Sequence, residues 1–239
     1  MWNDTVNLRD FYATSLGQVA RRAIRQRIRA AWPDAKDQSV LGLGYATPYL
    51  GLFRTEARRV AAAMPAAQGV LHWPSEARGL TLLADEAELP FEDLSIDRVL
   101  VIHALECTEQ VRPLMREIWR VLSGSGRLLI VAPNRAGLWA RFERTPFGHG
   151  RPYSPDQLTR LLRDTMFTPL GASSGLFVPP SRWRMVLSAA PAWEKIGERW
   201  FPRFAGVIIA EATKQIYAAQ PEAKERRRRT VLDMPRRAP

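Results

Sequence analysis

The sequence contains a single cysteine, Cys107, and only three histidines among its 239 residues. One cysteine excludes an intramolecular disulfide and an all-cysteine zinc site. The histidines, His72, His103 and His149, do not pair at the spacing of metal ligands, so we predict no bound metal. Such low cysteine usage fits a reducing compartment, and we expect a cytoplasmic protein.

Long hydrophobic runs are also missing. No apolar stretch approaches the ~18 residues that a membrane-spanning helix needs, and we therefore expect no membrane span. The first residues, Met1-Trp2-Asn3-Asp4, do not form the basic and apolar regions of a secretory signal. Hydrophobic residues still make up 46 % of the chain, which is typical of a globular protein and sufficient for one α/β domain.

Acidic residues are outnumbered, with 24 Asp and Glu against 35 Lys and Arg, for a net charge of +11. Residues 224–239 alone carry +5 of this charge. A basic tail can bind nucleic acid or anionic lipid through counterion release, or it can be a solvated extension. We expect one domain over residues 1–220, followed by a basic, disordered tail over residues 221–239.

Helical and extended patterns alternate along the chain. Three- and four-residue spacing of apolar side chains predicts one long helix over residues 8–32, within an N-terminal helical segment 1–35. We expect strands at 39–43, 59–63, 81–84, 96–102, 127–132, 170–178 and 204–214, and helices at 111–122, 154–164 and, interrupted by a proline, 182–200. Strands that alternate with helices indicate a parallel, doubly wound α/β sheet.

Residues 133–155 differ in composition from the segments around them, because they are rich in proline, glycine, arginine and aromatic residues. This composition predicts a long ordered loop. Loops of this length are uncommon in compact domains and often cover a functional site, so the loop is a candidate lid.

The order of motifs between residues 83 and 131 is the most informative feature of the sequence. Asp85-Glu86-Ala87 and Leu89-Pro90-Phe91 precede an apolar strand, and an amphipathic helix ends before Gly124-Ser125-Gly126 and the apolar run 128–131. This order resembles the second half of the cofactor domain of class I S-adenosylmethionine (SAM)-dependent methyltransferases, in particular the type 11 branch. The resemblance implies a Rossmann-like sheet of seven strands with helices on both faces and an antiparallel last strand. It also implies SAM, or its product S-adenosylhomocysteine, as the cofactor.

The first half of that domain is present in a degenerate form. The family's glycine-rich motif aligns with residues 40–48, where Gly44 agrees, Gly42 stands at the usual acidic position, and Ala46 and Pro48 replace glycines. No carboxylate follows the expected second strand before Glu76. The resemblance implies that the residues in contact with the cofactor are Gly42, Gly44, Ala46, Asp85, Glu86 and His103. Asp85 has an alternative role as a turn or capping residue.

Candidates for chemistry are few, since methyl transfer requires mainly positioning. His103 would follow the fourth strand and is the candidate catalytic base, with a structural hydrogen-bonded role as the alternative. Asn134, His149 and Tyr153 are candidates for contacts with the methyl acceptor from the loop 133–155, although His149 lies between glycines and suits a turn.

Two functions follow from these observations. The first is SAM-dependent methylation of a small molecule, and the second is an inactive methyltransferase-like binding or regulatory subunit that has lost SAM binding. The chain lacks an Asn/Asp-Pro-Pro-Tyr/Phe motif after the fourth strand, so we do not expect nucleic acid as a partner except through the basic tail. A protein partner or a homodimer remains open, because the tryptophan-rich C-terminal segment could pair subunits.

Overall fold

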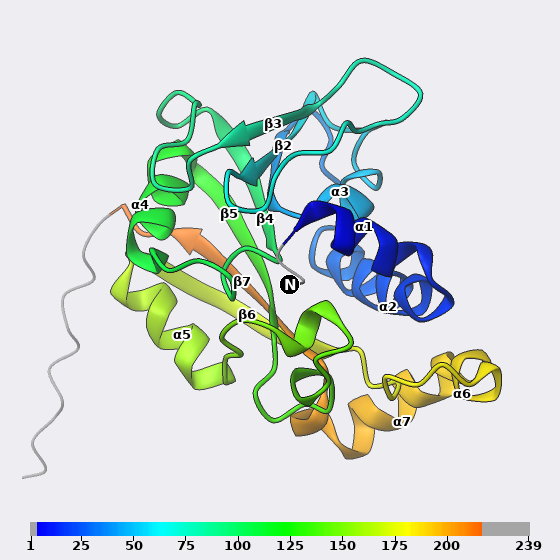
Figure 1. Ribbon diagram of the computed structural model, residues 1–239. Coiled ribbons are helices and arrows are strands. Elements are labelled where there is room, and N and C mark those ends of the chain that lie inside the picture. Colours follow the sequence, from blue (N-terminus) through cyan, green and yellow to red (C-terminus); the bar gives the residue numbers. More distant parts are fainter. Residues whose placement is uncertain (1–3, 217–239) are drawn as a thin grey trace, which may run out of the picture.

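The computed structural model describes residues 4–216 and contains one seven-stranded sheet (Figure 1). The strands are β1 Ser39–Gly44, β2 Arg59–Pro65, β3 Thr81–Ala84, β4 Ile96–Ile102, β5 Leu122–Pro133, β6 Phe167–Gly175 and β7 Val207–Lys214, in the order β3-β2-β1-β4-β5-β7-β6. The last strand, β7, is antiparallel to β5 and β6, and the pairs among β1–β5 are parallel. The predicted α/β fold is therefore confirmed. The expected tail, residues 221–239, lies outside the described residues.

Helices cover both faces of the sheet. They are α1 Thr5–Ala13, α2 Ser15–Ala31, α3 Thr47–Leu50, α4 Val111–Val121, α5 Pro155–Asp164, α6 Arg184–Ser188 and α7 Ala190–Trp200. Side chains alternate along each strand, so Leu100 and Ile102 of β4 pack in the core with α1–α3. Val99 and Val101 pack in a second core with α4 and α5. Among residues 4–216, no helix is long and apolar enough to cross a membrane.

The N-terminal segment forms two helices, so the prediction of one long helix over residues 8–32 is wrong. Thr14 interrupts it with an extended backbone, and its side chain accepts a hydrogen bond from the Gly17 backbone N–H, which caps α2. A Cβ atom at Gly17 would lie 2.0 Å from the Phe11 carbonyl oxygen. The break lets α1 turn across the sheet edge while both helices keep the same apolar spacing.

Several strand boundaries also differ from the sequence-based expectation, among them the start of β7 at Val207, three residues after the predicted start. Gly124 and Gly126 lie inside β5, which begins at Leu122, five residues before the predicted start. A Cβ atom at Gly126 would lie 2.4 Å from the Leu122 side chain, so the glycine permits the strand to begin directly at the end of α4. Strand β6 begins and ends three residues before the predicted strand 170–178.

Two segments without strands lie at the edges of the domain. The loop 133–155 contains two short 3₁₀ turns, η1 Trp139–Arg141 and η2 Pro146–Gly148. The connection between β6 and β7 contains α6, α7 and a third turn, η3 Pro202–Phe204. We call residues 182–204 the α6–α7 segment, and Figure 1 shows its helices at the periphery of the molecule.

Candidate cofactor site

The predicted cofactor residues meet at the carboxyl ends of the parallel strands, where open α/β sheets bind ligands. Gly44 ends β1, Asp85 follows β3, and His103 follows β4. Gly44 has a φ of +77°, and a Cβ atom there would lie 2.3 Å from the Ile102 carbonyl oxygen. Only glycine meets both conditions without strain. Gly44 therefore keeps the backbone conformation and the close approach of chains that the glycine-rich motif predicts.

His103 lies in a chain of buried hydrogen bonds. Tyr49 Oη donates to Tyr12 Oη over 2.9 Å, Tyr12 Oη lies 2.8 Å from His103 Nε2, and His103 Nδ1 lies 3.2 Å from Glu106 Oε1. Burial raises the pKa of Tyr12 well above its usual value, so the phenol keeps its proton. Because Tyr12 accepts from Tyr49, its own proton points to His103 Nε2, which leaves Nδ1 to donate toward Glu106.

The backbone at His103 is held in an uncommon conformation. Its φ is +54°, in the left-handed region that costs a non-glycine residue of order 1–3 kcal/mol. The Gln68 amide Nε2 donates to the His103 carbonyl oxygen, and the Tyr45 N–H donates to the Ile102 carbonyl oxygen over 2.9 Å. Both carbonyl oxygens at the end of β4 are therefore engaged by donors of the chain itself.

Aromatic side chains from two distant segments close the site. The rings of Tyr12 in α1 and Tyr45 stack with centroids 5.9 Å apart. Phe147, in the loop 133–155, places its ring 4.9 Å from the imidazole of His103. The same loop contacts Glu106 through the Arg151 N–H, which donates to the Glu106 carbonyl oxygen over 2.8 Å. Helix α1 and the loop 133–155 thus cover the end of β4 together.

Little free space remains at the strand ends. The cavity between the ends of β1–β4 and α4, which Leu43, Met64, Glu86 and Ala104 help to line, has a volume of about 10 Å³. That is room for about one water molecule, whereas small-molecule sites occupy roughly 300–1,000 Å³. A cavity of this size does not hold an adenosyl cofactor.

Two polar atoms within the closed site lack hydrogen-bond partners. Glu106 Oε2 and Gln68 Oε1 are buried, and neither accepts a hydrogen bond from a described residue. Both residues contact His103 through their other polar atom. Glu106 Oε1 lies beside the imidazole Nδ1, and Gln68 Nε2 donates to the His103 carbonyl oxygen. Buried acceptors of this kind are uncommon because an unmade hydrogen bond costs about 1–3 kcal/mol.

The remaining predicted cofactor residues have local partners. Asp85 is exposed, and its Oδ1 accepts from the Ala87 N–H over 2.8 Å, which is the turn role weighed as its alternative. Glu86 accepts from the Thr108 hydroxyl. Gly42 and Ala46 face each other, since a Cβ atom at Gly42 would lie 2.6 Å from the Ala46 Cβ. This contact needs two small residues and leaves no opening between them.

The candidate acceptor residues divide into two groups. Asn134 Nδ2 donates to the carbonyl oxygens of Arg203 and Ala205 over 3.0 and 2.8 Å, and His149 Nε2 lies within hydrogen-bonding distance of the Glu143 carbonyl oxygen. These contacts hold the loop together and tie it to the chain before β7. Tyr153 is half-buried, its backbone N–H donates to the Pro133 carbonyl oxygen over 2.9 Å, and burial followed by the Glu106 carboxylate raises its pKa.

Sequence reasoning missed Tyr12 and Phe147 as site residues. Tyr12 lies in a predicted helix with no polar motif around it, and Phe147 lies in an irregular loop. Tyr12 is 91 positions from His103. No local sequence signal marks either residue, because only the folded chain brings them to the end of β4.

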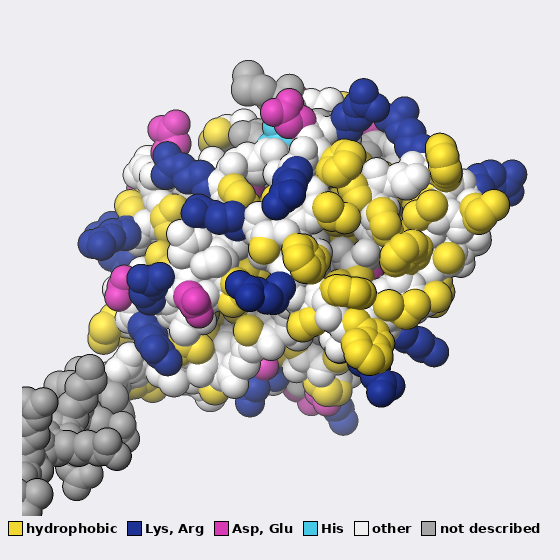
Figure 2. Space-filling model, turned by 90° about the horizontal axis from the view of Figure 1, so that it is seen from below, with side chains coloured by type: hydrophobic (Ala, Val, Ile, Leu, Met, Phe, Trp, Pro, Cys, Tyr) yellow, Lys and Arg dark blue, Asp and Glu magenta, His cyan; other side chains and the backbone are white. Residues whose placement is uncertain are grey.

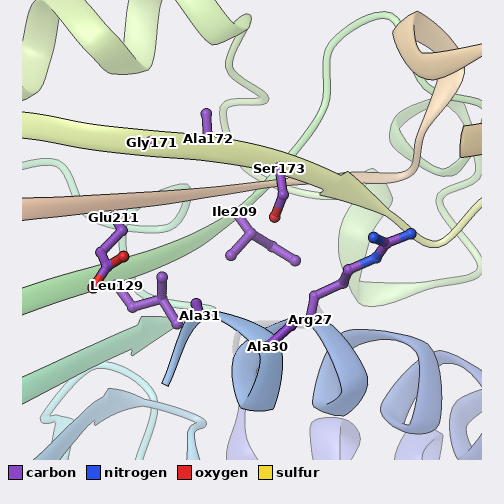
Figure 3. A pocket seen from close by; sticks show the side chains of 9 residues that line it. All are labelled: Arg27, Ala30, Ala31, Leu129, Gly171, Ala172, Ser173, Ile209 and Glu211. Atoms are coloured by element: carbon purple, nitrogen blue, oxygen red, sulfur yellow. The ribbon is translucent and has the colours of Figure 1, made fainter. Parts of the chain in front are cut away.

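A larger groove lies elsewhere, between α2 and the strands β5, β7 and β6 (Figure 3). It has a volume of about 270 Å³, but its charged groups already have partners. Arg27 pairs with Glu198, and Glu211 accepts from Trp32 Nε1 and Arg127 Nη1. The residues that line this groove therefore include no charged side chain without a partner. Within residues 4–216, no three or more His, Cys, Asp or Glu side chains are placed to hold a metal.

Comparisons with known proteins agree with the fold. Residues 41–130 match the family model described as a methyltransferase domain. The chain is 33 % identical over 139 residues to a protein of Mycobacterium tuberculosis, strains CDC 1551 and H37Rv, described as a probable S-adenosylmethionine-dependent methyltransferase. That alignment covers 54 % of this chain and 50 % of the relative, so the chain spans about half the length of the curated relatives it matches.

Solved structures extend the agreement beyond the matched segment. A SAM-dependent methyltransferase of Thermotoga maritima superposes with a TM-score of 0.60 at 17 % identity, covering 87 % of this chain and 94 % of its own. The methyltransferase from a complex with the Haloferax volcanii Trm112 methyltransferase activator gives a TM-score of 0.63 at 16 % identity, with coverages of 90 % and 96 %. Residues 41–130 are therefore similar to a methyltransferase domain, and the seven-stranded sheet has the fold of solved SAM-dependent methyltransferases.

Proposed function

We propose that this chain is a SAM-dependent methyltransferase that acts on a small molecule, and that the arrangement around His103 is the closed state of its site. The observation that carries the proposal is the pair of buried acceptors, Glu106 Oε2 and Gln68 Oε1, at the carboxyl ends of the strands that match the family. A buried carboxylate oxygen without a donor favours a cationic, donor-bearing ligand. SAM has both properties.

Binding requires the site to open, and the contacts that must separate are few. Tyr12 comes from α1 and Phe147 from the loop 133–155, while β1–β4 form the rigid floor. Withdrawal of Tyr12 leaves His103 Nε2 without its phenol partner, and Glu106 still orients the ring through Nδ1. In that state we propose that His103 removes the proton of the methyl acceptor. The proton would go to Nε2, the atom that now hydrogen-bonds with the Tyr12 hydroxyl.

The proposal also retains the finer assignments. Gly42, Gly44, Ala46, Asp85, Glu86 and His103 are the proposed cofactor residues. Asn134, His149 and Tyr153 are the proposed loop contacts of the acceptor. We propose a single domain over residues 1–220 and a cytoplasmic protein. A small-molecule acceptor is favoured because the segment after β4 lacks the motif typical of nucleic-acid methyltransferases.

Calorimetric titration with SAM and S-adenosylhomocysteine tests the proposal. We expect saturable binding by the full chain. Glu106→Gln should weaken SAM binding at least tenfold, because hydrogen bonds to charged groups contribute roughly 1.5–3 kcal/mol. Glu88→Gln is the matched control, since Glu88 is exposed, and it should bind as the wild type does. Absence of saturable binding at millimolar ligand would leave the alternative, an inactive methyltransferase-like binding or regulatory subunit.

A further inference from the structure

The α6–α7 segment exposes large apolar side chains that the domain could have buried. Trp183 is 77 % exposed, Met185 83 % and Trp200 67 %. Trp193, Ile196, Phe201 and Phe204 complete the exposed set. Helix α6 has no buried residue, and α7 buries only Ala190 and Gly197. Figure 2 shows hydrophobic side chains gathered over one side of the face seen from below, with Lys and Arg around them.

The exposed side chains of α7 lie on one side of the helix. Trp193, Ile196 and Trp200 recur at spacings of three and four residues, which places them along one stripe. Gly197 faces the domain, where a Cβ atom would lie 2.3 Å from the Phe177 ring. The helix is therefore fixed by its small residues and presents its large ones outward, which is the reverse of a helix stabilised by its own apolar face.

Charge on the segment is separated in the same way. Its two acids point toward the domain: Glu194 accepts from the backbone N–H groups of Leu176, Phe177 and Val178, and Glu198 pairs with Arg27 of α2 over 2.6 Å. Its five cations are Arg182, Arg184, Lys195, Arg199 and Arg203. None of the five forms an ion pair with a described residue. The outward surface is thus apolar and cationic.

We propose that the α6–α7 segment binds the surface of anionic lipid membranes, with its tryptophan and phenylalanine side chains at the headgroup level. Helices that lie in a membrane interface combine Trp, Phe and other apolar residues with Lys and Arg. A second copy of the chain fits this face poorly, because pairing it with itself would bring five cations against five. Single-stranded nucleic acid would use the same cations and rings, but Met185 and Ile196 add exposed aliphatic area that suits a lipid interface.

Co-sedimentation of the full chain with vesicles tests the proposal. We expect binding to phosphatidylcholine vesicles that contain 30 % phosphatidylglycerol, and much weaker binding to pure phosphatidylcholine. The triple variant Trp183→Ala, Trp200→Ala, Phe204→Ala should lose at least tenfold in affinity for the anionic vesicles. The triple variant Arg182→Gln, Arg184→Gln, Arg203→Gln should lose about a hundredfold, since each cation near an anionic surface contributes about fivefold.

The matched control replaces exposed apolar residues outside the segment: Val70→Ala, Leu83→Ala and Leu170→Ala. It should bind as the wild type does. The basic residues 224–239 are the same in every variant, so their own attraction to lipid does not affect the comparison. Thermal unfolding should show the same midpoint for the wild type and the α6–α7 variants, because the changed side chains are exposed.

Three outcomes would overturn the proposal. The first is equal vesicle binding by the wild type and the tryptophan variant, which would assign any binding to the tail. The second is a wild-type dimer, by light scattering, that the same variant dissociates while vesicles are not bound. The third is an oligonucleotide complex that this variant abolishes in the absence of vesicle binding.

Discussion

The site at the end of β4 and the α6–α7 segment use the same kind of residue in opposite ways. Tyr12, Tyr49 and Phe147 are almost fully buried around His103, while Trp183 and Trp200 are mostly in solvent. The first group fills the space at the carboxyl end of β4. The second group lies on a helical surface that no other described element covers.

This difference shows that aromatic content alone does not indicate a role. Around His103 the phenol oxygens find hydrogen-bond partners and the rings find packing partners, so closure of the site contributes to stability. On α6 and α7 the rings contact little of the domain, so their contribution to folding is small. The buried rings around His103 therefore stabilise the closed arrangement, whereas the exposed rings of α6 and α7 leave apolar area for binding.

The largest expected effect comes from truncating one ring in each region. Phe147→Ala should lower the free energy of unfolding by about 3–5 kcal/mol, because it opens a cavity beside His103 and Trp139. Phe204→Ala should change it by no more than about 0.5 kcal/mol, since that ring is mostly exposed. Urea denaturation of both variants measures the difference, and similar losses would contradict the contrast between the regions.

A somewhat smaller effect is expected where β1 meets β4. Gly44→Ala should cost about 2–4 kcal/mol, because it adds a Cβ atom against the Ile102 carbonyl and forces alanine into a positive φ. Gly51→Ala is the control, since a Cβ atom there meets nothing within 4 Å and the backbone is right-handed. A neutral Gly44→Ala would mean that the strand ends can separate freely.

The smallest effect concerns a single hydroxyl. Tyr12→Phe should cost about 1–3 kcal/mol at pH 7, because His103 Nε2 loses its donor and the Tyr49 hydroxyl its acceptor. Burial raises the pKa of Tyr12 in the folded chain, whereas the unfolded tyrosine ionises near pH 10. The stabilisation by the Tyr12 hydroxyl is therefore complete below about pH 10 and is lost as the pH rises.

Above pH 10 the difference in stability between the wild type and Tyr12→Phe should shrink by up to about 1.4 kcal/mol per pH unit. Unfolding curves at pH 7, 10 and 11 measure this change. A difference that stays constant over this range would show that Tyr12 ionises as easily in the folded chain as in the unfolded one.

Sequence reasoning recovered the architecture well and the site only in part. The strands 39–43, 81–84 and 96–102 were found because apolar runs bounded by turn residues are local signals. The break at Thr14 was missed because the apolar spacing continues through it, and only the capping contact with Gly17 shows it. Gly44, Asp85 and His103 were placed at the correct strand ends by motif order.

The sequence by itself determined the α/β alternation, because hydrophobic periodicity is a property of neighbouring residues. The resemblance of its motif order to methyltransferases implied the antiparallel last strand, which the structure confirms. Only the tertiary structure decided that the site is closed, since Tyr12 and Phe147 reach His103 from segments far away in the chain. It also decided which aromatic residues are exposed. Burial depends on what packs against a side chain. The outer surfaces of α6 and α7 are not covered by any other described element.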